Sequence, residues 1–206
     1  MIHLIGAGGH GKVVFDALLE SGAEPDAIRV RDGQAQRTGD AFMGTVIDTP
    51  EIDDRLAGQR FHVTVGDAAA RARLFAQAQA AGAQALTLLH PSAQVSRFAA
   101  LGDGAFVAAM AVVGPDAVLG QGVIVNHGAI VDHDCSVGDF SHIAPRAALG
   151  GGARIGARCL IGAGAVVLPG VVIGDDVVLG AGAVAVRDIA SNQTWTGVPA
   201  TPKEAP

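Results

Sequence analysis

The sequence predicts a small α/β domain followed by a parallel β-helix. Three observations indicate this fold class: strands alternate with helices early in the chain, a glycine-rich motif joins the first strand to the first helix, and a six-residue repeat fills most of the remainder. The chain has 206 residues, which is enough for two small domains with a real core. We place these domains at residues 1–85 and 86–206.

The N-terminal domain is predicted from short apolar runs that alternate with helical patterns. Strands are expected at residues 2–5, 27–30 and 61–67, and helices at residues 13–20 and 68–82. Strands that alternate with helices in this way form a small parallel sheet, so a Rossmann-like α/β domain is expected.

The second domain is predicted from a hexad that keeps its phase from Leu89 to Val184. The first position is always Leu, Val or Ile, the fifth is small, and the second is often glycine. An amphipathic helix repeats near 3.6 residues and cannot hold this phase. In a parallel β-helix each hexad forms one strand and one turn, three hexads close a triangular coil, and residues 18 apart stack in columns. Glycine in the turns permits positive φ angles.

Composition and charge exclude several classes of protein. The net charge is −6 and there is no basic run, so nucleic-acid binding is not expected. No signal peptide and no apolar run of membrane-spanning length is present, so a soluble cytoplasmic protein without membrane contact is expected. Cys135 and Cys159 both occupy the inward fifth position, and we interpret them as reduced core residues.

The glycine-rich motif predicts a nucleotide site. Gly6, Gly8 and Gly11 match GxGxxG between a strand and a helix, and Asp32 follows at the spacing of a ribose-binding acid. The loop amides and the helix N-terminus would bind a diphosphate, Asp32 would bind the sugar or base, and His10 could donate to a phosphate. The domain is too short for both halves of a dinucleotide site.

The chain as a whole resembles bacterial nucleotide-sugar acetyltransferases. The resemblance rests on "GAGGHGK" at 6–12, the hexads, "VDHDCSVGDFSHIAP" at 131–145 and "GVPA" at 197–200. The family includes amino-sugar N-acetyltransferases of the bacillosamine and perosamine type, with sialic acid O-acetyltransferases as close relatives. It implies a left-handed β-helix, a homotrimer, acetyl-CoA as co-substrate between adjacent prisms, and a nucleotide-linked amino sugar between prism and N-terminal domain.

The resemblance also implies roles for single residues. His133 matches the catalytic base and Asp134 the acid that supports it, which is often Glu in this family. His142 matches a residue near the acetyl group and pantetheine, and Ala163 and Ala181 match CoA contacts. The nucleotide-binding positions are matched by Gly8, Gly9, His10, Asp32 and Gly66. In one branch two acids end the second strand, and here Arg31 replaces the first, which leaves the base, uracil or guanine, open.

The residues around His133 support the same chemistry. A histidine with a pKa near neutrality can accept the proton of an attacking amine, and a carboxylate beside it fixes the tautomer and raises its pKa. Gly151 lies 18 residues after His133, so its uncovered amide is expected to hold the thioester carbonyl and the developing oxyanion. Asn126, an outward polar residue, is a candidate to bind the sugar. His127, His133 and His142 lie in different columns, so no metal is expected within one subunit, and a site shared across a trimer interface stays open.

The leading interpretation is N-acetylation of a nucleotide-linked amino-deoxysugar by direct transfer from acetyl-CoA. A second interpretation keeps the enzyme class and changes the acceptor to a sugar hydroxyl, as in sialic acid O-acetylation. A third interpretation belongs to another class: a non-catalytic scaffold whose N-terminal domain binds a nucleotide or NAD as a regulatory sensor.

Overall fold

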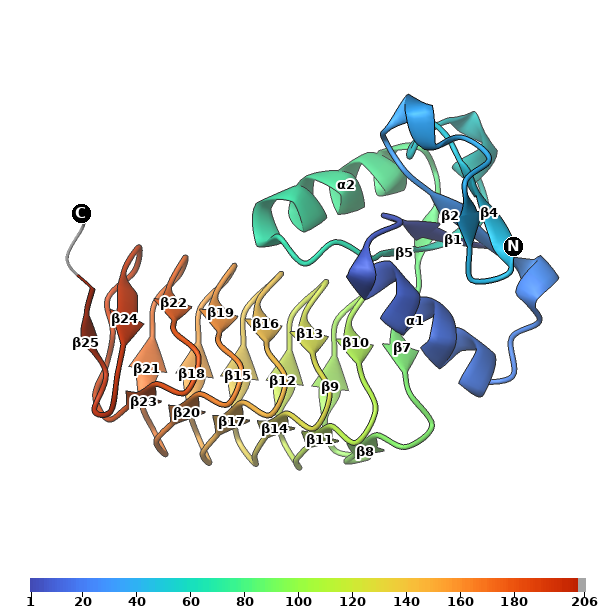
Figure 1. Ribbon diagram of the computed structural model, residues 1–206. Coiled ribbons are helices and arrows are strands. Elements are labelled where there is room, and N and C mark those ends of the chain that lie inside the picture. Colours follow the sequence, from blue (N-terminus) through green and yellow to red (C-terminus); the bar gives the residue numbers. More distant parts are fainter. Residues whose placement is uncertain (204–206) are drawn as a thin grey trace. The chain divides into compact units, whose positions relative to one another are not determined.

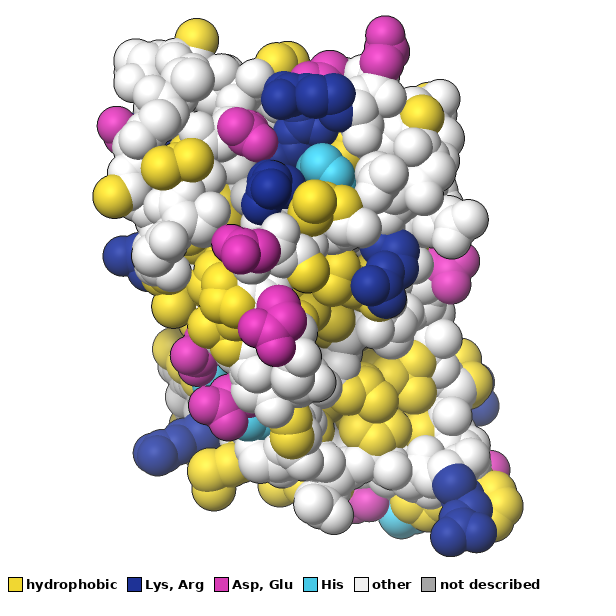
Figure 2. All heavy atoms as spheres, turned by 90° about the vertical axis from the view of Figure 1, so that its right-hand side faces the viewer, with side chains coloured by type: hydrophobic (Ala, Val, Ile, Leu, Met, Phe, Trp, Pro, Cys, Tyr) yellow, Lys and Arg dark blue, Asp and Glu magenta, His cyan; other side chains and the backbone are white. Residues whose placement is uncertain are grey.

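The computed structural model describes residues 1–203 and forms two compact units (Figure 1). The first unit spans Met1–Pro91 and the second begins at Ser92. In the described part of the chain, neither helix has the length and apolar character needed to span a membrane. Basic, acidic and hydrophobic side chains are interspersed on the face drawn in Figure 2.

The first unit is a sheet with the strand order β3-β4-β2-β1-β5-β6, in which only the β3–β4 pair is antiparallel. The strands of this sheet are β1 (Ile2–Ile5), β2 (Ile28–Arg31), β3 (Ala41–Phe42), β4 (Thr45–Asp48), β5 (Arg60–Val63) and β6 (Gln84–Ala85). The unit also contains β7 (Leu88–Leu89), which lies outside this sheet. Its helices are α1 (Gly9–Glu20) and α2 (Ala68–Ala80), with short 3₁₀ turns η1 (Pro25–Ala27), η2 (Ala35–Arg37) and η3 (Asp54–Leu56).

The two helices cover opposite faces of this sheet (Figure 1). All four residues of β1 are buried as a result, which is the pattern of a parallel strand covered on both sides. Phe61 of β5 packs edge-on against Phe75 of α2, with ring centroids 5.2 Å apart. Phe15 of α1 meets Phe42 in the same manner on the other side, at 6.0 Å. The predicted α/β domain is confirmed.

Two predicted boundaries in this unit were wrong. Helix α1 begins at Gly9 rather than near Val13, because the second half of the glycine motif forms its first turn. Strand β5 ends at Val63 rather than continuing to residue 67. The Thr64 hydroxyl donates to the carbonyl oxygens of Ile5 and Gly6 at 3.0 and 2.5 Å, which bends the chain toward the glycine loop.

The second unit is a three-walled parallel β-helix. The first wall contains β8 (Gln94–Val95), β11 (Val112–Val113), β14 (Ile130–Val131), β17 (Ala148–Leu149), β20 (Val166–Val167) and β23 (Val184–Ala185). The second contains β9 (Ala100–Leu101), β12 (Val118–Leu119), β15 (Ser136–Val137), β18 (Arg154–Ile155) and β21 (Val172–Ile173). The third contains β10 (Phe106–Val107), β13 (Ile124–Val125), β16 (His142–Ile143), β19 (Leu160–Ile161), β22 (Val178–Leu179), β24 (Thr194–Thr196) and the antiparallel β25 (Thr201–Pro202).

The predicted columns are confirmed, because register partners lie 18 residues apart, as in the pairs Val112–Ile130 and Ile124–His142. From Val107 onward, the aliphatic first positions and the small fifth positions are buried in one core along the prism. Both cysteines belong to this core and are unpaired.

We expected glycine in the turns to provide positive φ angles. At the second position of the hexad, glycine has a different role. The positive φ falls at the fourth position, for example at Gly182 (67°) and Asp134 (60°). A Cβ atom added at the second-position Gly138 would lie 2.6 Å from the backbone of Ala157 in the next coil. Glycine at this position therefore allows successive coils to approach closely.

Candidate active site

The glycine-rich loop forms an open helix N-terminus. Gly6 has a φ of 116°, and a Cβ at Gly11 would lie 2.5 Å from the Gly6 carbonyl oxygen, so these two glycines are needed to fold the turn. Gly8 is the N-cap of α1, and a Cβ on Gly8 or Gly9 would meet nothing within 4 Å. No acidic side chain lies in the first turn of α1, where His10 is half-buried. The backbone amides of this turn thus present a site suited to an anion.

Asp32 fastens the loop to the end of β2. Its carboxylate accepts hydrogen bonds from the Ala7 N–H (3.2 Å) and the Gln34 N–H (3.0 Å). Arg37 donates to the same carboxylate at 2.8 Å and to the Ala7 carbonyl oxygen at 3.2 Å. Arg37 was missed in the sequence, because an exposed-looking arginine in a polar loop carries no pattern.

Gly66 lies in the turn between β5 and α2, next to the glycine loop. The side chain of Val65 is the nearest neighbour of a Cβ built on Gly6, at 2.8 Å. The buried Arg71 donates to the carbonyl oxygens of Val65 and Gly66 at 2.9 and 2.7 Å. Burial lowers the pKa of Arg71 to about 10, so it remains charged at neutral pH. The structure therefore brings the loop, Asp32 and Gly66 together at the carboxyl edge of the sheet.

Arg31 points away from this loop and fixes the segment after β4. Its side chain is 1% exposed and donates to Asp53 at 2.6 Å. Asp53 also accepts from the side chain of Arg55 at 2.8 Å and from its N–H at 3.0 Å. Hydrogen bonds from Arg55, and then from Arg31, hold the pKa of Asp53 far below its usual range.

His133 lies at a corner of the prism with its side chain 57% exposed. Its Nδ1 lies 2.7 Å from Asp134 Oδ2, and its backbone N–H donates to Asp132 at 2.7 Å. The hydrogen bond to Asp134, with the nearby charge of Asp132, raises the pKa of the imidazole. Because Asp134 accepts the proton on Nδ1, Nε2 is left as the basic atom of the ring.

Gly151 stacks against this imidazole. A Cβ built on Gly151 would lie 2.5 Å from both Cε1 and Nε2 of His133, so only glycine leaves room for the ring in this orientation. Within residues 1–203 no acceptor takes the Gly151 N–H. A basic ring nitrogen and an open backbone donor therefore lie on consecutive coils.

Asn126 and His142 interact directly, although sequence reasoning gave them separate roles. The His127 N–H donates to Asn126 Oδ1 at 2.8 Å, so the Asn126 amide nitrogen faces His142 Nε2 at 3.0 Å. An NH₂ group can only donate, so Nε2 accepts, and the proton of a neutral His142 ring is on Nδ1. Asn126 thus selects the tautomer of His142.

Ala163 and Ala181 are exposed on one corner of the prism. The Gly164 N–H donates to Pro145 and the Gly182 N–H to Ala163, both at 2.9 Å, which joins these positions into one column. The two cysteines are not suited to act as nucleophiles. Burial raises the pKa of both Cys135 and Cys159, which keeps them as neutral thiols. Among the described residues, no three His, Cys, Asp or Glu side chains are grouped closely enough to hold a metal ion.

Two family models match parts of the chain. Residues 1–78 match the PglD N-terminal domain, and residues 152–185 match the bacterial transferase hexapeptide repeat. Curated proteins yield no match.

Solved structures give close matches over nearly the full chain. The acetyltransferase domain of PglB from Neisseria gonorrhoeae FA1090, in complex with acetyl coenzyme A, is 38% identical with a TM-score of 0.91, and the match covers 98% of each chain. PerB from Caulobacter crescentus, in complex with CoA and GDP-perosamine, is 38% identical with a TM-score of 0.89 and coverages of 98% and 97%. WeeI from Acinetobacter baumannii AYE, at 18% identity and a TM-score of 0.65 over 98% and 99% of the two chains, shares the fold.

The predicted fold class, a Rossmann-like domain followed by a left-handed β-helix of hexapeptide repeats, is confirmed. With these matches the chain belongs to the family of nucleotide-sugar acetyltransferases, and it is an acyltransferase that uses acetyl-CoA.

Proposed function

We propose that the chain transfers an acetyl group from acetyl-CoA to the amino group of a nucleotide-linked amino-deoxysugar, with His133 as general base. The observation that carries this proposal is the His133 imidazole, oriented by Asp134 at 2.7 Å and packed against Gly151 on the next coil. The complexes of PglB with acetyl coenzyme A and of PerB with GDP-perosamine support the two substrate classes.

In this proposal the N-terminal unit binds the nucleotide. The amides of Gly8 and Gly9, with His10, bind the diphosphate at the N-terminus of α1. Asp32 and the Gly66 turn flank the ribose of the nucleotide. Asp32 already accepts three hydrogen bonds from the protein, so its first task is to hold the loop in the shape that receives the phosphates.

The chemical step needs a base and an oxyanion donor. His133 Nε2 takes the proton from the amine as its nitrogen attacks the thioester carbonyl, and Asp134 stabilises the resulting imidazolium. The Gly151 N–H donates to the carbonyl oxygen as negative charge develops, a contribution of about 3 kcal/mol for one such donor. As the C–S bond breaks, His133 returns the proton to the departing sulfur. No acyl-enzyme is needed, in keeping with the two buried thiols.

The remaining residues position the co-substrate. His142, with its proton on Nδ1, lies near the acetyl group and pantetheine, and Asn126 keeps this tautomer while it also borders the sugar. The exposed Ala163 and Ala181 allow pantetheine to lie against the backbone. We infer that the enzyme works as a homotrimer with acetyl-CoA between adjacent prisms, and that its unpaired cysteines belong to a reducing cytoplasm.

A thiol-release assay tests this function. The chain is incubated with acetyl-CoA and a panel of nucleotide-linked amino sugars and sialic acids, and the product is identified by mass spectrometry. We expect release with a nucleotide-linked amino sugar, and a loss of roughly 10²–10⁴-fold in His133→Ala. His90→Ala is the matched control and should retain activity. Release only with sialic acid, or near-normal turnover in His133→Ala, would contradict the proposal.

A further inference from the structure

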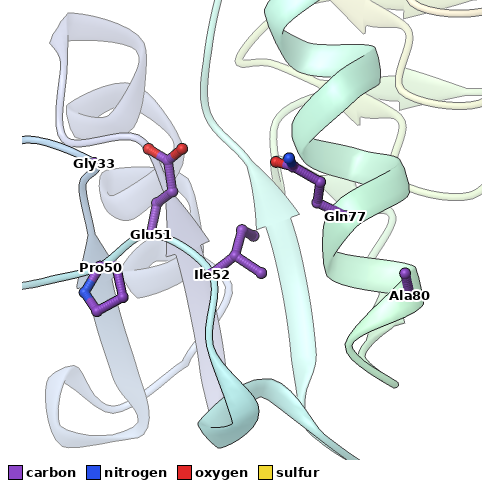
Figure 3. Close-up of a pocket in the computed structure, with 6 residues that line it drawn as sticks. All are labelled: Gly33, Pro50, Glu51, Ile52, Gln77 and Ala80. Atoms are coloured by element: carbon purple, nitrogen blue, oxygen red, sulfur yellow. The ribbon is translucent and has the colours of Figure 1, made fainter.

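A cavity of about 410 Å³ lies between the segment after β4 and the last two turns of α2 (Figure 3). It is lined by Gly33, Pro50, Glu51, Ile52, Gln77 and Ala80. None of these residues belongs to the loop, the turn or the prism positions described above.

The position of the cavity relates it to the nucleotide. Gly33 directly follows Asp32, and strands β2 and β4 end together because Arg31 and Asp48 are register partners. The loops after these strands therefore leave the same edge of the sheet as the glycine loop, which is where open α/β sheets bind nucleotides. A nucleotide with its diphosphate on the loop and its ribose at Asp32 would bring its base next to Gly33, which lines the cavity.

Glu51 is the charged residue of this cavity, and its place is well defined. A Cβ atom on Gly33 would overlap the Glu51 carboxylate, so the missing side chain at Gly33 makes room for it. Two residues later, Asp53 is tied to the buried Arg31 and to Arg55, which anchors the segment. Within residues 1–203 the Glu51 carboxylate takes part in no hydrogen bond or ion pair, so its oxygens are available to a ligand.

We propose that this cavity binds the base of the nucleotide-linked sugar, that the base is guanine, and that Glu51 selects it. This inference rests on the proposed function. An ionised carboxylate can only accept, and it has two parallel oxygens. Guanine presents two adjacent donors, N1–H and the 2-amino group, which match that pair. Uracil presents one N–H between two carbonyl oxygens, and those oxygens would face the carboxylate with like charge.

The other walls fit a flat aromatic base. Pro50, Ile52 and Ala80 are apolar, and Ile52 projects into the space between the Glu51 segment and α2 (Figure 3). Gln77 lies on the opposite wall and offers an amide, whose Oε1 accepts from Arg73 at 3.4 Å. Its NH₂ group is left free to donate a hydrogen bond, and guanine O6 or N7 could accept it.

Calorimetry with GDP, IDP and UDP on the full chain tests the proposal. We expect GDP to bind at least tenfold more tightly than UDP, and IDP, which lacks the 2-amino group, to bind between them. In Glu51→Gln the affinity for GDP should fall roughly tenfold or more, whereas UDP should bind as well as before or better, because an amide offers one acceptor and one donor to N3–H and O4. Asp54→Asn is the matched control: it removes the same charge from the next turn, outside the cavity, and should preserve the ratio of GDP to UDP affinity within twofold.

The outcomes separate this inference from the proposed function. If the chain binds UDP as tightly as GDP, the guanine assignment is overturned, while acetyl transfer to a UDP-linked amino sugar would leave the proposed function standing. If GDP is preferred but Glu51→Gln keeps the preference, the role of Glu51 is overturned. If no nucleotide-linked amino sugar releases thiol from acetyl-CoA, the proposed function fails, and the calorimetric preference alone decides the guanine assignment.

Discussion

At the scale of single residues, the candidate base depends on one backbone conformation. Asp134 occupies the fourth position of its hexad with a φ of 60°, the left-handed value that turns the chain at a prism corner. In this turn its carboxylate comes back to 2.7 Å from the Nδ1 of the preceding His133. Asp and Asn tolerate this conformation better than most side chains, so an acid can serve here both as turn residue and as partner of the histidine.

The charge of Asp134 should control the pH dependence of the reaction. Its hydrogen bond raises the pKa of His133, and a general base works only when unprotonated, so activity is lost as the pH falls through this raised pKa. In Asp134→Asn the turn is kept but the charge is removed, so the pKa falls toward 6.5 and the acidic limb of log kcat/KM moves to lower pH. The plateau should fall by roughly tenfold to a hundredfold, because the base is weaker.

Asp132→Asn is the control for this pH profile, because Asp132 acts on the ring through its charge and is the second cause of the raised pKa. It should move the acidic limb in the same direction by a smaller amount. An acidic limb that stays in place in Asp134→Asn, or moves to higher pH, would show that His133 does not carry the titration.

At the scale of elements, the prism depends on how closely its coils stack. Gly138→Ala should lower the free energy of unfolding by about 3 kcal/mol, because the new methyl group lies 2.6 Å from the Ala157 backbone, which cannot move without separating two coils. Gly182→Ala is the matched control: it has a φ of 67° and no atom within 4 Å of the added Cβ, so only backbone strain of about 1 kcal/mol applies. Urea unfolding at a fixed protein concentration compares them, and equal losses would contradict this role of the second position.

The elements also show where prediction from sequence succeeds. The hexad fixed the phase of every prism strand, because each first position must face the interior and a shift by one residue would expose the whole set. Residues 32–58 carry no such repeat, and the β3–β4 hairpin and η3 within them were not predicted. Their shape depends on contacts between distant residues, such as Arg31 with Asp53, 22 positions apart. No local pattern contains this ion pair, and therefore Glu51 could not be placed from the sequence.

In the candidate site, too, some contacts could be predicted from the repeat and others could not. The column rule placed Gly151 against His133, because stacking at 18 residues follows from the repeat itself. It did not reveal the contact between Asn126 and His142, which are 16 positions apart and meet diagonally across two coils. Such diagonal contacts depend on side-chain direction, which a periodic pattern of residue types leaves undetermined.

At the scale of the whole molecule, one wall of the prism carries a run of aliphatic outward residues. After Gln94, the outward residues of its column are Val112, Ile130, Ala148, Val166 and Val184. Val112 and Ile130 are 37% and 42% exposed. The equivalent column of the second wall also has exposed valines, Val118 and Val172, but Ser136 and Arg154 interrupt it. A continuous aliphatic column on a surface is typical of a subunit interface, so this wall is a candidate contact of the proposed homotrimer.

A charge placed in this column should break the assembly. In Ile130→Glu a carboxylate would have to be buried without a partner at the interface, which costs several kcal/mol per subunit, whereas in the monomer the same side chain stays in water. Sedimentation equilibrium should give three times the 20.6 kDa chain mass for the wild type and one chain mass for Ile130→Glu at micromolar concentration. Ser136→Glu, which introduces the same charge on the wall with Arg154, should remain trimeric. If Ile130→Glu stays trimeric and Ser136→Glu dissociates, the interface lies on the second wall, and acetyl-CoA would have to bind along a different pair of corners.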